Sequence, residues 1–102
     1  MKIQQGDVII KKCSKIPASA KRVKRSIRGF VLAEGEATGH AHVIIDNVEV
    51  YEADGVLYLK NSEQVSVRHE EHKPVTLSPG IWKVEIVKEY DPFKEEARKV
   101  MD

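Results

Sequence analysis

The fold is decided by residues 40–59, which have the sequence HAHVIIDNVEVYEADGVLYL. Alternating side chains in this stretch fit β-strands that bury one face. The pattern is interrupted at Asp54-Gly55, and Asp-Gly between alternating runs is a strong hairpin signal because Gly accepts a positive φ. Asp46-Asn47 breaks the pattern in a similar way. We therefore expect two hairpins here, one turning at each dipeptide.

Further strand-like segments lie on both sides of this stretch. They are β-branched or alternating runs bounded by turn residues, at 7–13, 30–33, 64–69, 74–77 and 81–90. The whole pattern predicts about seven or eight short antiparallel strands, which favours a sandwich or a barrel. Residues 93–101 alone show a weak helical stripe, which predicts a short C-terminal helix. We expect a small all-β single domain spanning residues 1–102.

Composition narrows the class of protein. The chain has 102 residues, of which 41% are hydrophobic and 32% charged, and this suits one globular domain. No apolar run approaches the roughly 20 residues that a membrane-spanning helix needs, and the first residues lack the apolar segment of a signal peptide. We therefore expect a cytoplasmic protein with no membrane partner. Cys13 is the single cysteine, so a disulfide within the chain is excluded.

Positive charge is concentrated near the beginning of the chain. Residues 1–28 carry nine basic side chains and one acidic one, whereas the remaining residues carry eight basic and fifteen acidic ones. Such asymmetry predicts an anionic partner or self-association, and we expect a homo-oligomer. The segment 16–28 fits neither strand nor helix, which predicts a mobile basic loop.

Five side chains of this basic region are candidates for contacts with nucleic-acid phosphates. They are Lys21, Arg22, Lys24, Arg25 and Arg28. Aromatic residues for base stacking are not interleaved with them, so a solvated charged loop is the competing interpretation. The alternative function is therefore a non-enzymatic nucleic-acid- or protein-binding module that uses this region for assembly.

All four histidines lie in two tight pairs, His40-Ala-His42 and His69-Glu-Glu-His72. Residues i and i+2 of a strand project from one face, about 6–7 Å apart at Cα, so the first two imidazoles can share one ion. The second pair is spaced by three residues, and its rings point together only if a bulge or a turn intervenes. The two intervening glutamates add carboxylates that can bind or orient.

These residues predict a metal site. We expect His40, His42 and His69 as the first ligands, with His72 and Glu71 as candidates for the fourth. Ligation by imidazole nitrogen favours a divalent transition metal, namely zinc, iron, nickel or copper. A structural polar network and proton transfer without a metal are the alternatives. Three ligands with an open position also build catalytic metal sites, yet the sequence identifies no substrate and no nucleophile–base pair.

The motifs around the histidines carry a resemblance over nearly the whole chain. The strings EGEATGHAH at 34–42 and HEEHKP at 69–74, with Pro-Gly at 79–80 and EYDP at 89–92, resemble a group of small uncharacterised proteins carried by phages and prophages. The resemblance implies a shared fold and carries no established activity.

A looser resemblance concerns one motif. Gly35 followed by His40, His42 and Asp46 is similar to the first motif of cupins, which are small β-barrels that hold a metal inside. The chain departs from cupins in two ways. The acid is aspartate where cupins have glutamate, and no histidine follows the Pro-Gly turn as the second cupin motif requires.

Overall fold

The computed structural model of the chain describes residues 2–34 and 40–86. These residues form antiparallel strands and contain no helix, so no helix among them is long and apolar enough to cross a membrane. The prediction of an all-β protein is confirmed. The strands are β1 (Lys2–Gln5), β2 (Val8–Cys13), β3 (Lys21–Arg22), β4 (Phe30–Glu34), β5 (Ala41–Ile44), β6 (Glu49–Ala53), β7 (Val56–Asn61), β8 (Val65–Val67), β9 (Val75–Leu77) and β10 (Gly80–Ile86).

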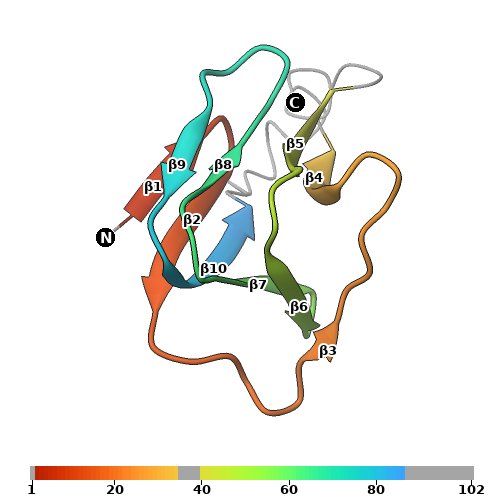
Figure 1. The fold of residues 1–102 in the computed structure, drawn as a ribbon, viewed down its shortest axis with the longest axis vertical. Coiled ribbons are helices and arrows are strands. Elements are labelled where there is room, and N and C mark those ends of the chain that lie inside the picture. Colours follow the sequence, from red (N-terminus) through yellow and green to blue (C-terminus); the bar gives the residue numbers. More distant parts are fainter. Residues whose placement is uncertain (1, 35–39, 87–102) are drawn as a thin grey trace, which may run out of the picture.

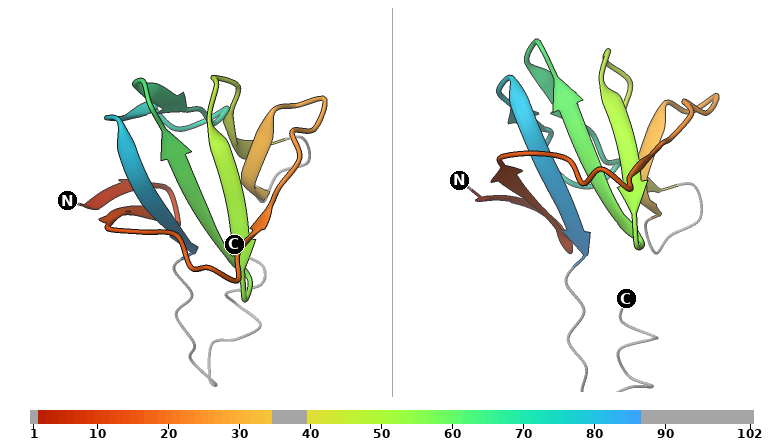
Figure 2. Two further views of the ribbon diagram at one scale, coloured as in Figure 1. Left: turned by 60° about the horizontal axis from the view of Figure 1, so that its bottom comes forward. Right: turned by 90° about the horizontal axis from the view of Figure 1, so that it is seen from below.

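Six strands form one sheet in the order β1-β2-β10-β7-β6-β3, while β4–β5 and β8–β9 form two separate hairpins (Figure 1). The strands β10, β7 and β6 lie side by side in both views of Figure 2. Side chains from the large sheet and from both hairpins meet in one core. The architecture is therefore sandwich-like rather than a closed barrel.

The core follows the period-2 alternation of the strands. In β10 Trp82 and Val84 are buried, and in β2 Val8 and Ile10 are buried, whereas the residues between them are not. Each fully buried aliphatic side chain contributes about 1.5–3 kcal/mol. The indole N–H of Trp82 donates to the carbonyl of Ser78 at 3.0 Å, so its one polar group is satisfied inside the core.

The two predicted hairpin turns have different outcomes. Asp54 and Gly55 have φ values of 51° and 78° and join β6 to β7, so the hairpin at this dipeptide is confirmed. The hairpin at Asp46-Asn47 is wrong, because β5 pairs with β4 and the chain then crosses to the large sheet. At this crossing the carboxylate of Asp46 accepts a hydrogen bond from the Ser66 N–H at 2.8 Å.

Two strands occur where the sequence analysis predicts none. The strand β1 pairs with β2 through a turn at residues 6 and 7. Within the segment 16–28, predicted as a mobile loop, β3 pairs with β6, and the N–H of Val23 donates to the carbonyl of Val50 at 2.8 Å. Part of that segment is thus an edge strand. The predicted helix at 93–101 lies outside the described residues.

Candidate functional site

Three segments far apart in sequence bring the histidines together. They are the beginning of β5, the connection from β8 to β9, and the β1–β2 turn. The backbone groups of Val43 and Arg68 exchange two hydrogen bonds of 2.9 and 2.8 Å, which hold the β8–β9 connection against β5 (Figure 1). The segment His40–His42 therefore faces His69 and His72.

The four imidazole rings form one continuous group, which we call the histidine cluster. His69 is at its centre, with ring centroids 4.4 Å from His42, 4.6 Å from His72 and 5.7 Å from His40. The rings of His42 and His72 are 6.0 Å apart and nearly parallel. The structure thus brings the two sequence pairs together, through the turn that the spacing of the second pair requires.

The buried side of the histidine cluster is organised by Gln5. Only 2% of the surface of Gln5 and of His42 is exposed. The Gln5 amide N–H groups donate to the carbonyls of Val67 and Lys73, each at 3.0 Å. Its Oε1 therefore faces His42 Nδ1, 2.8 Å away, and must accept. His42 consequently carries its proton on Nδ1 and presents a lone pair on Nε2.

Burial lowers the pKa of His42 below the ordinary value of 6.5, and the neighbouring His69 lowers it further. The carboxylate of Asp7 acts in the opposite direction. Its Oδ1 lies 3.7 Å from His42 Nε2. Because desolvation disfavours the charged form, His42 is neutral at pH 7. Neutral imidazole is the form that binds metal ions.

The exposed side of the histidine cluster contains its most compact donor group. Ligand atoms of His40, His69 and Glu70 all lie within 4.8 Å of one another. The Ala41 N–H donates to Glu70 Oε1 at 2.9 Å, and this bond holds the pKa of the Glu70 carboxyl below its usual range. Glu71, the carboxylate predicted from the sequence, lies beside His40, with 3.6 Å between Oε1 and Nδ1.

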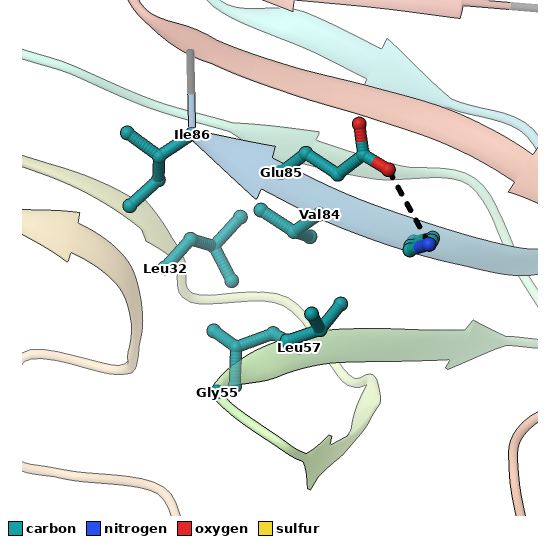
Figure 3. A pocket seen from close by; sticks show the side chains of 8 residues that line it. Leu32, Gly55, Leu57, Val84, Glu85 and Ile86 are labelled. Carbon is teal, nitrogen blue, oxygen red and sulfur yellow. Dashed lines mark ion pairs between the residues drawn. The ribbon is translucent and has the colours of Figure 1, made fainter. Parts of the chain in front are cut away.

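The donor group of His40, His69 and Glu70 is open to solvent on one side. A shallow depression of about 250 Å³ adjoins it, lined by Ala41, Val43, Arg68, His69 and Glu70. A larger depression of about 450 Å³ lies at the junction of β7, β10 and β4, where the ion pair between Lys83 and Glu85 borders apolar side chains (Figure 3). No histidine lines this larger depression.

The arginines of the basic segment contact the chain's own groups. Arg22 lies 3.9 Å from Glu49, and Arg28 lies 3.4 Å from Glu34. Arg25 donates to the carbonyls of residues 45 and 46. Lys21 and Lys24 are exposed cations on the same segment. The three arginines thus contact groups of the chain itself, and binding of nucleic acid by the segment stays a prediction.

Four residues at the site were not among the predicted ligands: Gln5, Gly6, Asp7 and Glu70. A signal for Gly6 and Asp7 exists, because Gly-Asp directly before the alternating run of β2 is itself a hairpin dipeptide. No local signal marks Gln5. Glu70 lies within the HEEH motif, and sequence spacing does not decide which of the two glutamates turns towards the imidazoles.

Comparison with known proteins identifies a family of the chain but no activity. The profile of a family described as Domain of unknown function (DUF8820) matches residues 4–87, a range that contains the whole histidine cluster. No curated protein and no solved structure matches the chain.

Proposed function

The chain belongs to the DUF8820 family of domains of unknown function, and we propose that it binds a divalent transition metal through His40, His69 and Glu70. The observation that carries the proposal is the mutual distance of their ligand atoms, all within 4.8 Å. Ligands bound to one ion at about 2.0–2.2 Å lie roughly 3.0–3.7 Å apart, depending on the angle at the metal. A contraction of at most about 1–2 Å closes the set, and movement of the two half-buried imidazoles towards Glu70 achieves it.

The chemistry of the donors selects the ion. Two imidazole nitrogens and one carboxylate favour zinc, iron, nickel or copper over magnesium and calcium, which prefer oxygen ligands. The hydrogen bond from the Ala41 N–H holds Glu70 in place and keeps it ionised. Carboxylates held in place in this way bind metal more tightly, because the side chain loses less conformational entropy when the ion binds.

The set leaves coordination positions unfilled by protein on its solvent side. The depression lined by Ala41, Val43 and Arg68 adjoins these positions, so water can reach the ion. Three protein ligands with an open position are typical of catalytic rather than structural metal sites. A hydrogen-bonded network of imidazoles without any metal is the competing explanation.

Metal titration of tag-free protein tests the proposal. We expect zinc, iron(II), nickel or copper to bind with at least one equivalent per chain, measured by calorimetry and elemental analysis after gel filtration. Glu70→Gln should weaken the affinity by at least about tenfold, whereas the matched control Glu71→Gln should change it less than about threefold. Binding below about 0.1 equivalent for every ion would leave the metal-free network as the explanation.

A further inference from the structure

We infer that, next to the proposed metal ion, the histidine cluster binds a second divalent transition-metal ion through Asp7, His42 and His72. The inference rests on the proposed function, because it extends that site into a dinuclear centre. Its ligands come from three segments, namely the β1–β2 turn, β5 and the β8–β9 connection.

The first ligand atom is His42 Nε2. The Gln5 amide uses both of its N–H groups on backbone carbonyls, so it accepts from His42 Nδ1 at 2.8 Å. The other ring nitrogen therefore carries a lone pair and no proton. An imidazole whose second nitrogen is anchored by a hydrogen bond is the usual state of a metal-binding histidine.

The second ligand atom is Asp7 Oδ1, which faces this lone pair at 3.7 Å. Neither atom carries a proton in the neutral-imidazole form, so two acceptors point at each other. Ligands bound at about 2.1 Å to one ion are separated by roughly 3.0–3.7 Å, depending on the angle at the metal. A cation between the two atoms would satisfy both, and the separation already fits.

The third ligand is His72, which approaches through Gly6. Gly6 has a φ of +60°, and a Cβ added there would lie 2.8 Å from His72 Nε2 and 3.4 Å from His42 Cε1. Because Gly6 has no side chain, both rings pack directly against the backbone of the turn that carries Asp7. His72 is exposed, so rotation about its side-chain bonds can bring Nε2 to the ion.

The two donor sets have the same composition. Each contains two imidazoles, one from each sequence pair, and one carboxylate, and the rings of His42 and His69 link the sets at 4.4 Å. One carboxylate in each set offsets the repulsion between two cations. Adjacent ions of this kind, about 3.5–4 Å apart, are used by proteins to hold both oxygens of a substrate.

The number of bound ions tests the inference on the full chain. Zinc titration followed by calorimetry and elemental analysis should give two equivalents per chain for the wild type and one for Asp7→Asn. Asp54→Asn is the matched control, because it changes an aspartate in another two-residue hairpin turn, and it should retain two. His72→Gln, at an exposed position, should also give one.

Copper(II) supplies a second readout. Two copper ions about 3.5–4 Å apart interact by dipolar coupling, so the spin-resonance spectrum of the doubly loaded wild type should be broadened, whereas copper-loaded Asp7→Asn should show the unbroadened spectrum of one ion. One zinc equivalent in both wild type and Asp7→Asn would overturn the second ion and leave the proposed function intact. No bound zinc, iron(II), nickel or copper in either protein would overturn both. An equal loss in Asp7→Asn and Asp54→Asn would also overturn the second ion.

Discussion

Gln5 Oε1 accepts a hydrogen bond from His42 Nδ1 at 2.8 Å, between two side chains that are both almost completely buried. The same Gln5 amide also donates to the carbonyls of Val67 and Lys73. One side chain therefore joins β1 to β5 and to both ends of the β8–β9 connection. It fixes the tautomer of the most buried imidazole while it holds the surrounding segments.

Replacing Gln5 by Leu should lower the free energy of unfolding by about 2–3 kcal/mol, because the His42 N–H and two carbonyls lose their partner. Urea unfolding followed by tryptophan fluorescence measures the change, since Trp82 lies in the core. Gln4→Leu is the control. Gln4 is the neighbouring glutamine, and its exposed side chain makes one hydrogen bond, to the Gly6 carbonyl. We expect Gln4→Leu to lower the free energy of unfolding by less than about 0.5 kcal/mol. Equal losses for both variants would contradict the anchoring role.

The depressed pKa of His42 predicts the pH dependence of stability in metal-free protein. The unfolded chain takes up a proton on this residue near pH 6.5, whereas the folded chain does so only at lower pH. Stability from this group is therefore complete above about pH 6.5 and decreases as the pH falls towards the folded pKa.

Urea unfolding in EDTA at pH 8, 7, 6 and 5 measures this dependence. We expect the free energy of unfolding to fall between pH 7 and pH 5 in the wild type and to fall less in His42→Gln, which has no titrating group at that position. Parallel pH curves for the two proteins would show that burial of His42 does not control the acid sensitivity.

The parts of the fold that the sequence predicts are those encoded by local signals. The turn at Asp54-Gly55 needs only two residues with positive φ between alternating runs, and it forms as expected. The corner at Asp46 has a similar local pattern, yet a long-range hydrogen bond to Ser66 and pairing with β4 direct the chain elsewhere. The strand β3 contains two cations, Lys21 and Arg22, so no apolar alternation reveals it.

As with the fold, only those features of the candidate site that local signals encode could be predicted from the sequence. Two histidine pairs predict a cluster, and the rings do meet. Gln5 could not be chosen, because its role depends on contact with a residue 37 positions away. The choice between Glu70 and Glu71 depends on which carboxylate accepts the Ala41 N–H, and neither periodicity nor spacing contains that information.

Two glycines in hairpin turns provide a matched test of the close approach to the histidine cluster. Gly6 and Gly55 both have positive φ, so each change to Ala should cost about 1 kcal/mol of stability. The Cβ at Gly6 meets the end of the His72 side chain, whereas nothing lies within 4 Å at Gly55. An exposed ring moves aside at little cost, so the two stability losses should be similar.

The same two variants should differ in metal binding. The displaced His72 ring cannot reach an ion beside Asp7, so Gly6→Ala should bind zinc at the second position at least about tenfold more weakly, and Gly55→Ala should bind as the wild type does. Zinc calorimetry on the two variants, compared at equal folded fraction, measures the difference. Identical zinc affinities would contradict the role of Gly6 in admitting the ring.

Metal binding through His69 should break the hydrogen bond of one specific backbone amide. The Glu71 N–H donates to His69 Nδ1 at 3.0 Å, so that nitrogen carries a lone pair in the metal-free protein. An ion bound at Nδ1 occupies this lone pair, and an ion bound at Nε2 moves the proton to Nδ1. Either way the hydrogen bond from Glu71 is lost.

Amide proton spectra recorded during zinc titration therefore provide a residue-specific test. Zinc should shift the Glu71 amide proton upfield and speed its exchange with solvent by at least about fivefold, because a free N–H exchanges faster than a bonded one. The Arg68 amide is the internal control, since it donates to the Val43 backbone carbonyl at 2.8 Å and not to an imidazole nitrogen. A Glu71 amide that keeps its position and exchange rate at saturating zinc would show that His69 does not bind the ion.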